Sequence, residues 1–132
     1  MYGVVIYNDN YTYEGNIVNE KPHGKGTFSY SNGDKYKGEC KYGKPDGYGV
    51  YDYKSGDKLS GFFSCGRING IGTYENNENI LKGHWRFNRK HGTFIKTDKI
   101  KLISNLQLWQ KGKLQECREI QYTRPELLQT TY

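Results

Sequence analysis

Hydrophobic and polar residues alternate along short stretches of this chain. Tyr13, Gly15 and Ile17 are spaced by two residues, and Gly26 and Phe28 follow with the same spacing. A period of two is typical of a β-strand, whereas the side chains of a helix repeat at about 3.6 residues. The pattern therefore predicts pairs of short antiparallel strands and places the whole chain in the all-β class.

The alternating stretches return at a fixed interval of 23 residues, most clearly as the paired glycines Gly24/Gly26, Gly47/Gly49 and Gly70/Gly72. A period of about 20–50 residues marks a repeat array, in which each unit buries its apolar face against its neighbours. The glycine pairs predict close backbone approach where one strand passes to the next. Residues that accept a positive φ recur in the same phase and predict hairpin turns near Asn10, Gly33, Gly56 and Asn79.

The unit resembles the MORN repeat (membrane occupation and recognition nexus), which reads approximately Tyr-x-Gly-x-Trp-x-x-Gly-x-x-x-Gly-x-Gly-x-Tyr. Trp85 stands where the tryptophan of that motif stands, and Ile17, Cys40 and Phe63 hold its place in the other units. The resemblance covers residues 2–96 and continues in blurred form through Trp109. The best match is the second unit, with Tyr36, Gly38, Gly43, Gly47, Gly49, Tyr51 and Gly56.

The resemblance implies an elongated, curved, single-layer antiparallel sheet of tandem hairpins. We expect it over residues 1–112, with a half repeat at 2–12, repeats at 13–35, 36–58, 59–80 and 81–101, and a degenerate closing unit at 102–112. In the fourth repeat the second glycine and its neighbour look deleted after Gly92. Residues 113–132 form a C-terminal tail, for which Pro125 predicts the start of a short helix and a frayed end is the alternative.

Composition fits a thin sheet with aromatic rows. Only 34% of the residues are hydrophobic, yet 15% are aromatic and 13 are tyrosines, a balance that disfavours a two-layer globule with an aliphatic core. Three widely separated cysteines lack the CxxC spacing of a metal site, and Cys40 is predicted to be a small core residue. The chain has neither a run of about 20 apolar residues nor the start of a signal peptide. We therefore expect a cytoplasmic protein, peripheral at a membrane, the cytoskeleton or a large assembly.

Positive charge is concentrated in the last third of the chain. The formal net charge is +6, of which residues 82–118 contribute +8, while the segments on either side contribute −1 each. A cluster of this kind attracts anionic surfaces, although a solvated sheet face that resists aggregation is an equal alternative. The candidate anionic-surface residues are Arg86, Arg89, Lys90, Lys96, Lys99 and Lys101, of which Arg89, Lys90 and Lys96 are predicted to face solvent.

Catalytic chemistry has little support in the sequence. His23 and His91 directly precede the first glycine of their units, so they are repeat-position residues rather than candidate ligands. Gly24-Lys25-Gly26 is not a phosphate loop, because a strand follows it and the motif recurs in every unit. We expect no enzymatic activity, no cofactor and no metal.

These observations favour a non-catalytic scaffold or adaptor that holds a helical or extended segment of a partner protein in an aromatic concave groove. The alternative is a peripheral membrane adaptor that binds anionic phospholipids through the basic third. Nucleic acid is disfavoured, since repeat packing accounts for the aromatic rows. The candidate groove residues are Tyr30, Tyr53, Phe63, Tyr74 and Trp85.

Overall fold

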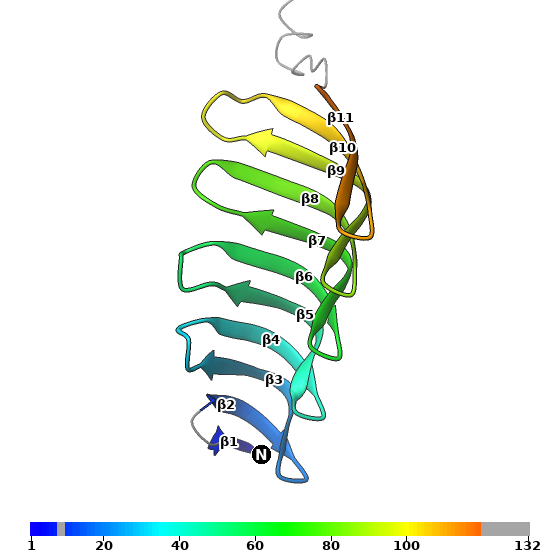
Figure 1. The fold of residues 1–132 in the computed structure, drawn as a ribbon. Helices are drawn as coiled ribbons and strands as arrows, with labels where there is room; N and C mark the ends of the chain where they lie inside the picture. The colour runs from blue at the N-terminus through cyan, green and yellow to red at the C-terminus, as the bar shows by residue number, and fades with distance from the viewer. Residues whose placement is uncertain (8–9, 120–132) are drawn as a thin grey trace, which may run out of the picture.

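A computed structural model describes residues 1–7 and 10–119 as one open antiparallel sheet of 11 strands (Figure 1). Strand order in the sheet follows chain order, so each strand pairs with its neighbours in sequence. The predicted single-layer sheet of hairpins is therefore confirmed. The strands are β1 (Tyr2–Tyr7), β2 (Tyr11–Val18), β3 (Lys21–Tyr30), β4 (Lys35–Lys41), β5 (Lys44–Asp52), β6 (Lys58–Ser64), β7 (Arg67–Glu75), β8 (Asn79–Arg86), β9 (Arg89–Asp98), β10 (Ser104–Gln110) and β11 (Lys113–Glu119).

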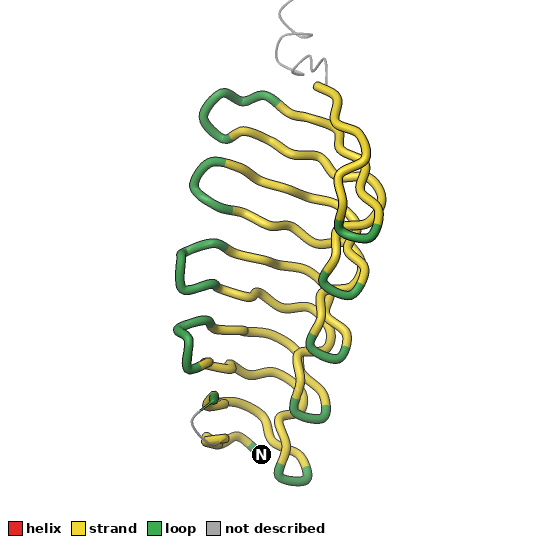
Figure 2. The backbone as a smooth tube through the Cα atoms, in the orientation of Figure 1, coloured by secondary structure: helices red, strands yellow, loops and turns green. Residues whose placement is uncertain are grey.

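Two kinds of turn alternate along the chain and form the two long edges of the sheet. The longer loops, on the left in Figure 2, lie where hairpin turns were predicted, for example around Gly33 and Gly56. Two-residue turns form the opposite edge, and both residues of each have a left-handed φ, as in Tyr42 (51°) and Gly43 (81°). This geometry matches the right-handed twist of the flanking strands. We refer to this side as the tight-turn edge.

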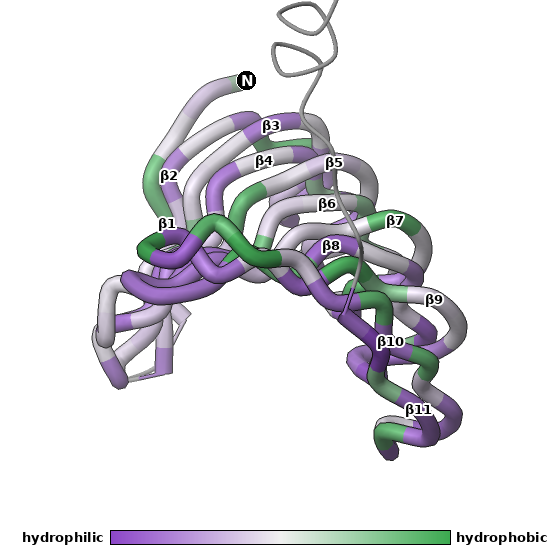
Figure 3. The backbone as a smooth tube through the Cα atoms, turned by 90° about the horizontal axis from the view of Figure 1, so that it is seen from above, coloured by the Kyte–Doolittle hydropathy of each residue, from purple (hydrophilic) through white to green (hydrophobic). Residues whose placement is uncertain are grey.

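The strands bend, so the sheet is an arch when seen from above (Figure 3). The pairings of β2 with β3, β4 with β5, β6 with β7 and β8 with β9 each carry a register shift after a glycine of the even-numbered strand, between Gly15 and Ile17, Gly38 and Cys40, Gly61 and Phe63, and Gly83 and Trp85. At each shift one residue of the even-numbered strand faces three of the odd-numbered strand, and a bulge of this kind bends the sheet locally. Because the bulge returns in the same phase, the bends line up and give the sheet a concave face.

The glycine pairs lie inside strands, so their predicted location between strands is wrong. Gly26 is in the middle of β3, opposite Gly15 on one side and Gly38 on the other. The predicted close approach is nevertheless present, since a Cβ on Gly26 would overlap the ring of Tyr13. The glycine row thus makes room for aromatic rings that lie flat across the concave face.

The core is the row of side chains that converge on the concave face. Tyr13, Phe28, Tyr36, Ile68 and Phe94 are at most 1% exposed, although the sheet has a single layer. Rings of successive strands are in contact, with centroids 4.8 Å apart between Tyr13 and Phe28. A thin sheet can bury side chains this completely because its curvature brings neighbouring rings together.

Cys40 is the small core residue that the repeat predicted. Its side chain is 3% exposed, and its Sγ lies 3.5 Å from the hydroxyl oxygen of Tyr13. The thiol fills the row that Phe63 and Trp85 occupy in later units.

The fourth unit contains a substitution rather than the expected deletion. Phe94 pairs with Gly83, in the position that Gly72 holds opposite Gly61 in the preceding unit. A Cβ on Gly83 would overlap the Phe94 ring. In the second unit the ring, Tyr36, is on the even-numbered strand and the glycine, Gly49, is on the odd-numbered one; here the two have changed places. The backbone pairing continues without loss.

The sheet extends past residue 112. Lys113–Glu119, expected to belong to a tail with a short helix, instead form β11 and pair with β10. The position predicted for that helix, at Pro125, lies outside the described residues. The part of the chain that the structure describes contains no helix long and apolar enough to cross a membrane.

Candidate functional site

An open groove of about 560 Å³ lies on the concave face, over the middle and the C-terminal half of the array. Its lining is mainly aromatic and aliphatic, with a single charged residue. The lining residues are Tyr51, Tyr53, Leu59, Phe63, Gly66, Ile68, Tyr74, Trp85, Asn88 and Lys90. Concave, mostly apolar hollows with a few polar groups are the usual form of binding sites.

The structure brings four of the five predicted groove residues together. Tyr53, Phe63, Tyr74 and Trp85 all line the groove, whereas Tyr30 lies on the same face but outside it. Phe63 and Trp85 are only 6% and 8% exposed, so they belong to the core and form the floor of the groove rather than the exposed aromatic surface that a groove residue should offer. Tyr53 and Tyr74 are half-buried and present the accessible aromatic surface.

The tyrosine hydroxyls along the groove rim already have partners. The Tyr51 hydroxyl donates to Oδ2 of Asp34 at 2.9 Å, and the Tyr74 hydroxyl donates to Oδ2 of Asp57. The hydrogen bond to Asp57 and burial raise the pKa of Tyr74 to about 12. Both tyrosines therefore stay protonated at neutral pH, and the bonds fix their rings in the wall of the groove.

Lys90 lies at the C-terminal end of the groove, over the aromatic face of Trp109. Its Nζ is 4.1 Å from the ring centroid, a cation–π contact. Burial, followed by repulsion from Lys96, lowers the pKa of the Lys90 ammonium. The prediction that Lys90 and Lys96 face solvent is therefore wrong, because both are half-buried and Lys96 pairs across the sheet with the buried Leu81.

A second hollow, of about 800 Å³, lies at the tight-turn edge. Two of its cations, Arg86 and Arg89, were predicted, and both flank the turn that contains the half-exposed Phe87. The other two come from neighbouring turns: Lys111 belongs to the basic segment 82–118, whereas the sequence missed Arg67. The lining residues are Arg67, Arg86, Phe87, Asn88, Arg89, His91 and Lys111.

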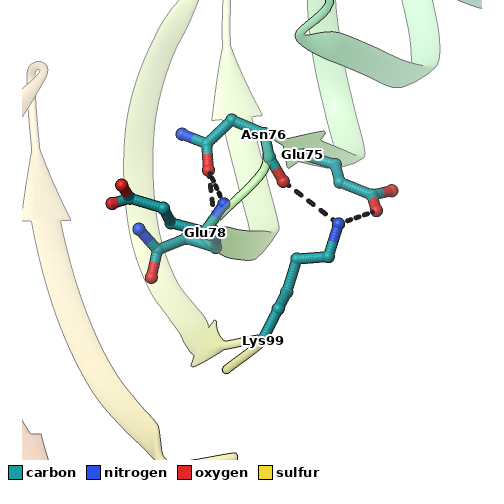
Figure 4. A network of polar contacts seen from close by, with 5 residues as sticks. Glu75, Asn76, Glu78 and Lys99 are labelled. Atoms are coloured by element: carbon teal, nitrogen blue, oxygen red, sulfur yellow. Dashed lines mark hydrogen bonds and ion pairs between the residues drawn. The ribbon is translucent and has the colours of Figure 1, made fainter. Parts of the chain in front are cut away.

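The two remaining candidates lie at the opposite edge of the sheet. Lys99 forms an ion pair with Glu75 at 2.8 Å and donates to the backbone oxygen of Asn76 (Figure 4). The backbone N–H of Lys101 donates to Asp98 in the adjoining loop. The six predicted anionic-surface residues are thus divided among the tight-turn edge, the concave face and the loop edge, and they do not form one patch.

Within the described residues, no group of three or more His, Cys, Asp or Glu side chains gathers as a metal site would require. The groove and the basic hollow are instead suited to non-covalent recognition, one through aromatic surface and the other through positive charge.

Comparison with known proteins agrees with the geometry. The MORN repeat family model matches residues 13–35, 36–58, 60–77 and 82–93, more than half of the chain and in the phase of the observed hairpins. None of the curated proteins matches the chain. MORN repeats are commonly associated with protein or membrane binding and are typically non-catalytic. The family match, the 23-residue hairpins and the ring-on-glycine rows together show that the chain belongs to the MORN repeat family.

Proposed function

We propose that this protein is a non-catalytic scaffold or adaptor that holds a helical or extended segment of a partner protein in the concave groove. The observation that carries the proposal is the open aromatic groove of about 560 Å³, whose rims are fixed by hydrogen bonds. A fixed aromatic surface loses little conformational freedom on binding, and so favours affinity. Its volume suits a few anchoring side chains of a peptide.

Tyr53 provides the sharpest test of this proposal. Its ring lines the groove beside Tyr74, with centroids 5.9 Å apart, and it is not part of the fully buried core. Tyr53→Ala should weaken binding of a captured partner by about 2 kcal/mol or more, roughly 30-fold. Partners would be isolated by affinity capture, identified by mass spectrometry and measured by calorimetry.

Tyr48→Ala is the matched control, because Tyr48 is a half-exposed tyrosine of β5 on the opposite face of the same sheet. The control should bind as wild type does. Both variants must first show the wild-type dichroism spectrum and melting transition. Normal partner binding by well-folded Tyr53→Ala and Tyr74→Ala variants would sink the groove proposal.

The basic hollow supports a second candidate function, docking on an anionic membrane surface. Four cations surround it, and Phe87 and the 75% exposed Tyr42 lie at tight turns of the same edge. Cations next to aromatic side chains suit the boundary between lipid headgroups and acyl chains. Each cation near an anionic bilayer contributes about 1 kcal/mol, and this contribution decreases as salt shortens the Debye length.

Vesicle flotation distinguishes this function from the first. If the edge docks on lipid, Arg86→Glu/Arg89→Glu should abolish flotation with phosphatidylserine vesicles, whereas Lys25→Glu/Lys37→Glu, an equal charge change at exposed positions of β3 and β4, should not. We expect weak flotation of the wild type at low salt and little at about 0.15 M. Strong flotation that resists salt would make membrane docking the primary function.

A further inference from the structure

Lys90 occupies a position that is buried in the three preceding units. Pro22, Pro45 and Ile68 hold the equivalent places, and all three are buried. The backbone shows the equivalence independently: the carbonyl oxygens of Pro22, Pro45, Ile68 and Lys90 each accept a hydrogen bond from the tight turn of the following unit, at 2.8–3.1 Å. A cation thus stands where the repeat otherwise places an apolar core residue.

The surroundings of Lys90 do not neutralise it. Within the described residues its ammonium forms no ion pair or hydrogen bond, and its nearest partner is the Trp109 ring at 4.1 Å. Two carboxylates at the loop edge of the concave face, Asp34 and Asp57, already accept hydrogen bonds from tyrosines of the groove rim. Lys96, on the same strand and face, adds a second positive charge.

A half-buried charge is costly to hold without a counterion, because the low-dielectric surroundings weaken its hydration. The same surroundings strengthen its attraction to an opposite charge that enters the groove. The end of the groove beyond Trp85 therefore complements an acidic group, while the part lined by Tyr53 and Tyr74 complements apolar ones.

We propose that the segment held in the groove carries an acidic side chain that pairs with Lys90, next to apolar side chains that pack on Tyr53 and Tyr74. This inference rests on the proposed groove function, and it also predicts the orientation of the bound segment along the groove. The acidic residue of the partner lies toward β9, and the apolar residues lie toward β5 and β7. Lys90 is thus a specificity determinant, which excludes segments that would place a cation there.

The experiment selects binders from a random peptide library displayed on phage, with the full chain as bait. Wild-type selections should enrich peptides that carry Asp or Glu beside apolar residues, and Lys90→Glu should replace that preference with Lys or Arg. Lys90→Met, which restores the apolar character of the position, should keep the fold and remove the acidic preference. Lys82→Met is the control, because Lys82 is exposed on the opposite face of the adjacent strand.

A double-mutant cycle then measures the pair directly. One selected peptide is synthesised with its acidic residue and with the corresponding amide. The wild-type protein should bind the amide peptide about 10-fold more weakly or worse, and Lys90→Met should bind both peptides equally.

Two failures remain distinguishable. Enriched peptides that require Tyr53 but show no acidic preference, or whose preference survives Lys90→Met, would overturn the role of Lys90 and leave the groove function standing. If no peptide is enriched, or if every enriched peptide binds Tyr53→Ala as well as wild type, the groove function fails and the pairing with Lys90 fails with it.

Discussion

At the scale of single residues, stability depends on aromatic rings that occupy space left free by glycine. The ring of Tyr36 covers Gly49, and that of Tyr13 covers Gly26 in the preceding unit. The Tyr36 hydroxyl also donates to the backbone oxygen of Glu39 at 2.6 Å, next to the bulge. One side chain thus fills the core and holds the bend, so the glycine that it covers has little tolerance for substitution.

Gly49→Ala should destabilise the protein by about 1–3 kcal/mol, because its Cβ would overlap the buried ring of Tyr36 and force it to move. Gly49→Val should be worse and should unfold or aggregate. Urea denaturation measures both. The control is Gly56→Asn: nothing lies within 4 Å of a Cβ at Gly56, so this variant carries only the backbone strain of a φ of 98° and should be destabilised less than Gly49→Val. A Gly49→Val variant that melts with wild type would show that the row is not structural.

Alkaline pH should weaken the sheet. Burial is the main cause that raises the pKa of Tyr30 to about 12, and the bond to Asp57 is the main cause at Tyr74, also about 12. Folding favours the protonated phenols, so their contribution is complete below the unfolded value of about 10 and is lost as pH rises through the folded values. The melting temperature should fall steadily from pH 10 upward. Tyr74→Phe should show a shallower fall, and an unchanged slope would contradict the assignment.

At the scale of elements, the loop of one unit is tied to the loop of the next. Oδ1 of Asp34 accepts from the backbone N–H of Lys54 at 2.8 Å, and Oδ2 accepts from Tyr51. The contact between Asp57 and Tyr74 repeats the pattern one unit later. These side chains set the spacing of the loop edge, as backbone bonds between turns set that of the tight-turn edge.

Asp34→Ala should loosen this connection without unfolding the sheet. Hydrogen exchange of the Lys54 amide should accelerate, because that N–H loses the only acceptor that it has within the described residues. Asp52→Ala is the control, since Asp52 forms an exposed ion pair with Lys58 at 3.2 Å and pairs of this kind contribute little. Exchange at Lys54 that is the same in both variants would count against the connection.

Turns were predictable from the sequence where the residue types themselves favour the turn conformation. Asn32-Gly33 is a turn signal on its own, and the loop edge was predicted from it and its equivalents. The tight turns were missed because Tyr42, Cys65 and Phe87 adopt a left-handed φ that these residue types seldom have. Gly43 and Gly66, 23 residues apart, were the available signal.

The groove was more predictable than the charged surfaces, for a geometric reason. Tyr53 and Tyr74 belong to two rows of the repeat that are two residues apart and so fall on one face, which is why they could be placed together from their spacing. A run of positive charge along the chain does not predict a patch on the surface. Each hairpin places residues about ten positions apart at opposite edges of the sheet. Comparing Lys90 with Pro22 and Ile68 would have shown that it occupies a core position.

At the scale of the whole molecule, the sheet is a row of similar units that contact only their neighbours. Gly38 and Gly61 occupy the same phase, and their partners Gly26 and Gly49 are equivalent as well. Stability of such an array is approximately a sum over units and their interfaces.

Deletion of residues 36–58, one complete unit, should leave a folded protein with a lower melting temperature, because β3 can then pair with β6 in the register it had with β4. Deletion of residues 37–58 is the control. The one residue that it leaves behind must either lengthen the loop after β3 or shift the register of β6 and turn its side chains to the other face, so this variant should melt at a lower temperature than the first. Dichroism and calorimetry measure both, and equal behaviour of the two deletions would contradict a register set by the repeat.

Strand order that follows chain order also has a mechanical consequence. A pull on the two ends of the sheet acts across the strands, so it loads the hydrogen bonds of one strand pair at a time instead of shearing many together. The sheet should therefore open like a zipper, at low force and in successive steps of one hairpin, and it should close again from whichever units remain intact. A protein built in this way can lengthen under tension and recover its shape.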